Sequence, residues 1–219
     1  MNILLTFVFL SASLDWYAVH KGWKKLEYFL KPATMVFLFI FLFLMTGFQG
    51  IALWFGIGIL FSLAGDVFLM LPKEQFIAGL VSFLLAHLAY IIGFNQSFPP
   101  LDAFGIIMAI ILGIVAARLY QYIAAGLVKQ EKEFLLKPVL IYTGVIAIML
   151  FSALLTLSRP EWDFRAAITV SVGAALFMLS DAILAWNKFV QPIKNGRVMN
   201  MAAYHLGQII LIYGVVMHI

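Results

Sequence analysis

Long apolar runs separated by short polar stretches make up most of the chain. Eight of these runs approach the length needed to cross about 30 Å of hydrocarbon, which takes roughly 20 mostly apolar residues. They cover approximately residues 2–19, 32–48, 51–71, 76–95, 102–124, 138–157, 165–186 and 199–218. The runs are too long and too uniformly apolar for barrel strands, and a single segment in lipid must satisfy its own backbone hydrogen bonds. The pattern therefore predicts eight transmembrane helices.

The composition supports a membrane protein. Hydrophobic residues make up 64% of the 219 residues and charged residues 11%, whereas a soluble domain carries about 25% charged residues. We therefore predict an all-α polytopic membrane protein with a single transmembrane domain over residues 1–219. Because the chain has no cysteine, disulfides, thiolate chemistry and Cys-based metal sites are excluded. Its lysines lie in short loops, which indicates membrane topology and no nucleic-acid partner.

The basic residues predict how the helices are oriented, because cytoplasmic loops carry an excess of lysine and arginine. The odd-numbered connections hold Lys21, Lys24, Lys25, Lys31, Lys73, Lys129, Lys132, Lys137, Lys188, Lys194 and Arg197. The even-numbered connections hold only Arg159 and Arg165. This asymmetry predicts that the odd connections are cytoplasmic and that both termini are non-cytoplasmic.

Three pairs of similar motifs recur in the same order along the chain. "FLKPATM" (29–35) matches "LLKPVLI" (135–141), "LAGDVFL" (63–69) matches "MLSDAIL" (178–184), and "AHLAY" (86–90) loosely matches "AYHLGQ" (203–208). Each unit would hold four helices, so the units have the same orientation. The motifs predict two parallel four-helix repeats, residues 1–97 and 98–219, related by a pseudo-twofold axis along the membrane normal.

Ionisable side chains inside apolar helices are candidate functional residues, because each costs about 2.5–3.5 kcal/mol at the bilayer centre. The candidates are Asp15, Asp66, His87, Arg118, Asp181 and His205, with Lys31 and Lys137 at predicted helix starts. Asp66 and Asp181 occupy matching positions in the two repeats, each about 8 Å inside the cytoplasmic helix end. His205 is at a similar depth, near Tyr204 and Gln208, whereas His87 is deeper. We expect the two aspartates to share a cavity open toward the cytoplasm.

Two carboxylates in one cavity of low dielectric constant would suit acid–base chemistry. Burial and mutual repulsion keep one proton on such a pair, which leaves an acid beside a base. The acid can protonate a substrate and the base can activate a water molecule.

Several residues also have simpler interpretations. Lys31 and Lys137 can be topogenic charges that reach the interface, Asp15 can pair with a lysine, and His87 can be a hydrogen-bonded packing residue. Two other functions remain open: a proton-coupled transporter of a lipid or small solute, and a metal-dependent membrane lipid hydrolase with His87, His205 and both aspartates as ligands. A purely structural scaffold is the simplest alternative.

The motifs around the aspartates resemble those of the YhhN family, whose animal members are lysoplasmalogenases. The resemblance rests on "FSLAGDVFLML" with "FIAGLVSFLLAHLAYIIGF", and on "GAALFMLSDAILAWNKF" with "VMNMAAYHLGQIILIYG". These stretches occur in order along nearly the whole chain, and the "LKP" of each half supports them.

The resemblance implies eight helices and hydrolysis of the vinyl ether bond of lysoplasmalogens, which yields a fatty aldehyde and a glycerophospho headgroup. It implies Asp66 and Asp181 as the catalytic pair, no cofactor or metal, and a lysophospholipid substrate taken from among the membrane lipids. Substrate-binding residues are then expected at Lys31, Lys137, Arg118, His87, Tyr90, Tyr204, His205 and Gln208. Short loops suggest a multi-pass protein of the bacterial inner membrane.

Overall fold

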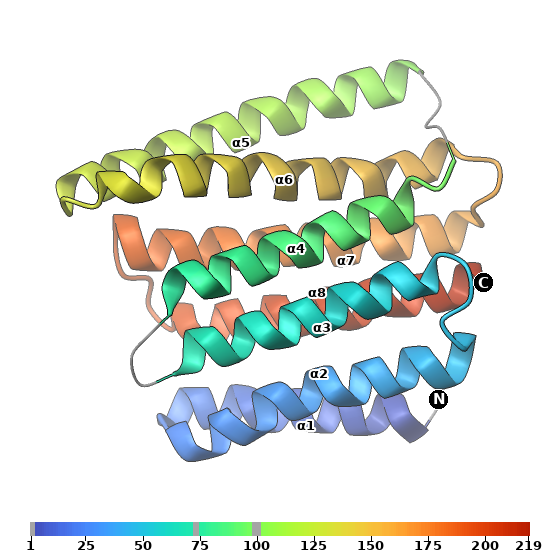
Figure 1. Cartoon of the computed structure of the whole chain (residues 1–219), viewed down its shortest axis with the longest axis horizontal. Helices are drawn as coiled ribbons and strands as arrows, with labels where there is room; N and C mark the ends of the chain where they lie inside the picture. Colours follow the sequence, from blue (N-terminus) through green and yellow to red (C-terminus); the bar gives the residue numbers. More distant parts are fainter. Residues whose placement is uncertain (1–2, 72–74, 98–101) are drawn as a thin grey trace.

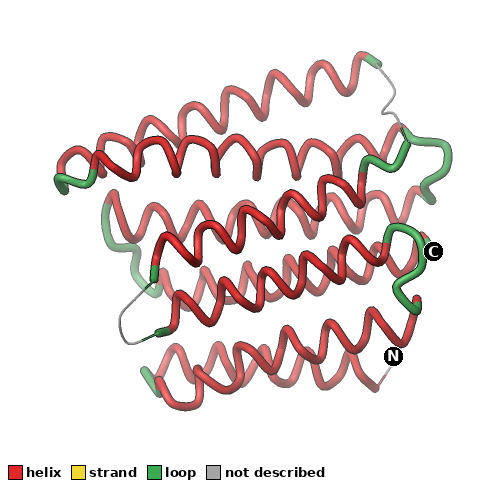
Figure 2. The backbone as a smooth tube through the Cα atoms, in the orientation of Figure 1, coloured by secondary structure: helices red, strands yellow, loops and turns green. Residues whose placement is uncertain are grey.

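The computed structural model describes residues 3–71, 75–97 and 102–219 and is all-helical over these ranges (Figures 1 and 2). Eight helices in this part of the chain are long and apolar enough to cross a membrane. They are α1 (Ile3–Lys21), α2 (Lys24–Thr46), α3 (Ala52–Met70), α4 (Phe76–Phe94), α5 (Ala103–Lys129), α6 (Leu136–Leu155), α7 (Phe164–Ala185) and α8 (Gly196–His218). The predicted all-α class and the eight membrane-spanning helices are confirmed.

Successive helices run antiparallel, and both termini lie at one end of the bundle (Figure 1). The α1–α2, α5–α6 and α7–α8 connections lie at the opposite end, which we call the basic end because most lysines lie there. Lys73 lies outside the described residues. Which end faces the cytoplasm remains a prediction, as does the two-repeat arrangement, whose boundary at residues 97 and 98 adjoins undescribed residues.

Several helices extend further into the polar connections than the apolar runs do. Helix α2 begins at Lys24 and contains Pro32 in its interior, so the expected start at residue 32 is wrong, and Lys31 lies two turns inside the helix. Lysine and glutamate are good helix formers. The first turns of α2 also bury Glu27, Leu30 and Lys31 against the bundle, so the helix can begin before the apolar run does. At the basic end, α7 continues as a π-helix (Trp186–Val190), and a 3₁₀ turn (Glu133–Leu135) precedes α6.

Helices α7 and α8 approach closely because glycines line their contact. A Cβ atom on Gly173 would lie 2.3 Å from the Leu211 backbone nitrogen, and one on Gly207 would lie 2.8 Å from the Phe177 nitrogen. Small residues at helix contacts are typical of membrane bundles, since packing and not the hydrophobic effect must hold the helices together. This approach fixes Phe177 and the polar face of α8 in the centre of the protein.

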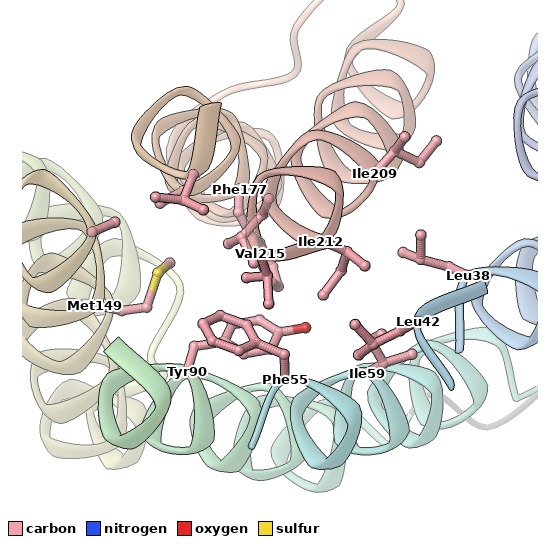
Figure 3. Close-up of a cluster of buried hydrophobic side chains, with 14 of the residues drawn as sticks. Leu38, Leu42, Phe55, Ile59, Tyr90, Met149, Phe177, Ile209, Ile212 and Val215 are labelled. Carbon is pink, nitrogen blue, oxygen red and sulfur yellow. The ribbon is translucent and has the colours of Figure 1, made fainter. Parts of the chain in front are cut away.

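The central core joins side chains from both halves of the chain. Figure 3 shows Leu38, Leu42, Phe55, Ile59, Tyr90, Met149, Phe177, Ile209, Ile212 and Val215 gathered around one centre. The rings of Phe55 and Tyr90 are stacked, with centroids 5.3 Å apart. Helix α5 is peripheral (Figure 1): its only buried residues among those described are Gly105, Ala116, Ile123 and Leu127.

The Gly173 contact predicts a large stability difference between two glycine-to-alanine changes. Gly173→Ala should lower the thermal unfolding midpoint of the detergent-purified protein, because an overpacked contact costs about 1–3 kcal/mol. Gly144→Ala on α6 is the matched control, since a Cβ atom there meets nothing within 4 Å. Equal midpoints for the two variants would contradict the packing described for α7 and α8.

Candidate functional site

Asp66 lies in a fully buried polar cluster formed by α2, α3 and α8. Its carboxylate forms an ion pair with Lys31, with Nζ 2.9 Å from Oδ1, and the Tyr204 hydroxyl donates to Oδ2 at 2.7 Å. Asp66 is 0% exposed and Lys31 4%. A buried charge is tolerated only when it is paired and hydrogen-bonded. The ion pair therefore explains why an apolar helix carries this acid.

Asp181 lies in a second cluster, formed by α4, α6 and α7. Its carboxylate is partly exposed. The Tyr142 hydroxyl donates a short hydrogen bond to Oδ2. The His87 Nε2 lies 3.3 Å from the same oxygen and 3.1 Å from the Tyr142 hydroxyl. The Asp181 side chain keeps 14% exposure, whereas that of His87 has none. Asp181 is thus the more exposed of the two aspartates.

Two phenylalanine rings lie between these clusters. The Phe177 ring centroid is 4.7 Å from that of His87 and 5.5 Å from that of Tyr204. Phe83 packs edge-on against both Tyr204 and Phe177. Among the described residues, Asp66 and Asp181 have no hydrogen-bonding partner in common. The two carboxylates are neighbours across an aromatic layer.

A third network links the two halves of the chain through Gln208. The Tyr90 hydroxyl donates to Gln208 Oε1 at 2.8 Å, and Gln208 Nε2 donates to the Ser62 hydroxyl at 2.9 Å. All three side chains are 0% exposed. Because Gln208 lies one turn after Tyr204 on α8, this network holds the helix face that presents Tyr204 to Asp66.

His205 faces away from Asp66, toward α1. Its Nδ1 accepts a hydrogen bond from the Trp16 Nε1 at 3.1 Å and lies 4.0 Å from the Asp15 carboxylate. Asp15 and His205 are both 0% exposed. The two histidines therefore belong to different clusters, and no group of three His, Cys, Asp or Glu residues that could hold a metal ion occurs within the described ranges.

The two other basic candidates lie on the outside of the bundle. Arg118 on α5 is exposed and donates to the Gln121 side chain at 3.4 Å. Lys137 at the start of α6 is also exposed. Neither residue lines the cavities next to the aspartates. Of the three cations expected at the headgroup, the structure brings only Lys31 to an aspartate.

Two cavities adjoin the clusters. An apolar crevice of about 60 Å³ is lined by α3, α4, α5, α6 and α7 and reaches Asp181 and Tyr142. A polar cavity of about 450 Å³ lies at the basic end and includes Lys31 in its wall. Leu69 and Leu184 line both cavities. Each of these leucines follows its aspartate by three residues, Asp66 on α3 and Asp181 on α7, so they lie on the same helix faces.

Comparison with known proteins identifies the family of this chain. The family model that matches residues 26–215 is that of the YhhN family. The chain belongs to the YhhN family. No solved structure matches the chain.

Relatives in the family carry an activity in their names. The chain is 28% identical to lysoplasmalogenase TMEM86A of Homo sapiens over 157 residues, which is 71% of this chain and 62% of the human protein. It is 31% identical to lysoplasmalogenase TMEM86B of Homo sapiens, over 68% of this chain and 58% of that protein. The chain thus matches less than two thirds of either relative's length. An uncharacterized Escherichia coli membrane protein, YhhN, is 24% identical over 94% of both chains.

The buried ion pair predicts a specific pattern of stability. Lys31→Met should strongly destabilise the purified protein, because removing one partner of a buried pair costs about 3–5 kcal/mol. The double variant Lys31→Met/Asp66→Asn should recover much of this loss, since no uncompensated charge then remains. Thermal unfolding in detergent measures both. A double variant less stable than Lys31→Met would contradict the pairing.

Proposed function

We propose that the protein is an integral membrane hydrolase that cleaves the vinyl ether bond of lysoplasmalogens. One observation carries the proposal: Asp181, held by His87 and Tyr142, reaches an apolar crevice, and Leu184, one turn away, lines both that crevice and a polar cavity. An amphiphile with an apolar chain and a charged headgroup fits these two environments. The names of the relatives support lysoplasmalogen as the amphiphile.

The substrate would lie with its vinyl ether beside Asp181. The crevice of about 60 Å³ has room for about two water-sized groups, so it holds the reacting end of the chain. Helices α4 and α5 both line the crevice, and α5 has few buried residues. The rest of the alkenyl chain would extend between these two helices toward the surrounding lipid.

Asp181 is the better candidate for the acid. Its proton would pass to the β-carbon of the vinyl ether, which forms a C–H bond and leaves an oxocarbenium ion. Water would then add to the cationic carbon and return a proton to the Asp181 carboxylate, and the resulting hemiacetal would separate into aldehyde and glycerol hydroxyl. His87 and Tyr142, which share one oxygen of Asp181, would orient the carboxyl group during both proton transfers.

Asp66 would act as the ion-paired member of the pair. Its ion pair with Lys31 and the hydrogen bond from Tyr204 favour the carboxylate. A carboxylate near the oxocarbenium ion stabilises the transition state, as the second carboxylate does in glycoside hydrolysis. Because Asp66 is buried behind Phe83 and Phe177, this effect would be electrostatic and without contact to the substrate.

The relatives also bear on the host membrane. We propose that the protein lies in a bacterial inner membrane, and the match to Escherichia coli YhhN over 94% of both chains supports this location.

The assignment predicts unequal effects of three aspartate-to-asparagine changes. Asp181→Asn should reduce turnover of a lysoplasmalogen about 10²–10⁴-fold, the usual contribution of a general acid, and Asp66→Asn should reduce it less. Asp102→Asn is the control, because asparagine caps a helix as well as aspartate does and Asp102 serves as the N-cap of α5. Aldehyde release from purified, folded variants measures all three. Turnover by Asp181→Asn within about threefold of the wild type would overturn the assignment of the acid.

A further inference from the structure

The polar cavity at the basic end is lined by more basic than acidic side chains among the described residues. Its charged lining residues are Lys24, Glu27, Lys31, Lys188 and Arg197. Among the described residues, four cations and one carboxylate thus line the cavity; Arg197 is paired with that carboxylate, and Lys31 is paired with Asp66. A cavity of about 450 Å³ with this balance of charge suits an anionic group larger than a single ion.

An ion pair with Glu27 fixes the position of the Arg197 guanidinium at the cavity wall. Its Nη2 donates to both Glu27 carboxylate oxygens, at 2.7 and 2.9 Å. Glu27 is 5% exposed, so the pair is anchored in the bundle. Nη1 and Nε bond to no residue in the described ranges, and together they carry three N–H donors. Arginine with a fixed plane and unused donors is well suited to bind a phosphate.

The cavity also lies at a suitable distance from the reacting group. Lys31 lines the cavity and contacts Asp66, so the cavity begins where the Asp66 cluster ends. In the π-helix that continues α7, Asn187 lines the cavity six residues after Asp181, about 9 Å along the helix axis. Five covalent bonds separate the vinyl ether oxygen of a lysoplasmalogen from its phosphorus, which spans roughly 6 Å when extended. A hydrogen bond of about 3 Å from a phosphate oxygen covers the remaining distance.

We propose that the polar cavity binds the phosphodiester of the lysolipid headgroup, with Arg197 and Lys24 as phosphate ligands and Glu27 as the residue that positions Arg197. The inference rests on the proposed function, because it places the headgroup of that substrate. A lipid headgroup is favoured over free phosphate, since Leu69 and Leu184 line both the polar cavity and the apolar crevice. An amphiphile can fill both spaces at once.

Two substrates with and without the phosphodiester test the proposal: a 1-alkenyl-glycerophosphoethanolamine and the corresponding 1-alkenylglycerol. Arg197→Gln should lower kcat/KM for the phospholipid about tenfold or more, mainly through KM, because a hydrogen bond to a charged group is lost. Its kcat/KM for the alkenylglycerol should stay within about twofold of the wild type. Lys194→Gln removes the same charge from an exposed residue outside the cavity wall and should leave both values unchanged.

A second pair of variants avoids the Glu27 ion pair. Lys24 and Lys25 are adjacent and both exposed, but only Lys24 lines the cavity. Lys24→Gln should therefore raise KM for the phospholipid, and Lys25→Gln should not. In the wild-type protein, glycerophosphoethanolamine should compete with the substrate at lower concentration than inorganic phosphate does. Equal competition by the two would overturn the headgroup assignment in favour of a free-phosphate site.

The outcomes separate this inference from the proposed function. Equal loss of activity on both substrates in Arg197→Gln would overturn the headgroup site while leaving vinyl ether hydrolysis in place. Cleavage of neither substrate by the folded wild-type protein would overturn the proposed function itself.

Discussion

The buried ion pair between Lys31 and Asp66 is the interaction on which the central arrangement depends. In a bundle surrounded by lipid, a carboxylate on α3 requires a cation, and α2 supplies it from a turn that begins well before the apolar run. The pair brings α2 against α3, and the hydrogen bond from Tyr204 adds α8. Together with the glycine contacts of α7 and α8, this cluster determines where the aromatic layer and the second aspartate lie.

The two aspartates occupy matching motifs but different surroundings. Asp66 has a lysine and a tyrosine as partners and is sealed from solvent, whereas Asp181 has a histidine and a tyrosine and reaches a crevice. Lys137, the residue that matches Lys31 in the second half, is exposed. This asymmetry agrees with the proposed roles, in which Asp66 stays ion-paired and Asp181 exchanges a proton. A symmetric pair side by side would not separate the roles in this way.

The helices could be predicted from apolar runs because lipid leaves a single segment few alternatives to a helix. The contacts of the site depend on which side chains face each other, which spacing alone does not determine. Depth along a helix separated His87 from the aspartates, yet His87 contacts Asp181. Nothing in the sequence distinguished Tyr142 from the other aromatic residues of its apolar helix. Glu27 and Arg197 lie in polar stretches that were expected to be loops, although the two residues form an ion pair between helices.

The central claim is that a carboxylic acid beside the apolar crevice protonates the carbon of a vinyl ether. Hydrolysis of a lysoplasmalogen by the purified protein in D₂O tests it most directly, with mass spectrometry of the fatty aldehyde trapped as it forms. Protonation of the vinyl ether carbon predicts one deuterium on the carbon next to the aldehyde carbon, and no aldehyde from the lysolipid with a saturated ether. Aldehyde without deuterium at that carbon, or an intact vinyl ether after incubation with the folded protein, would contradict it.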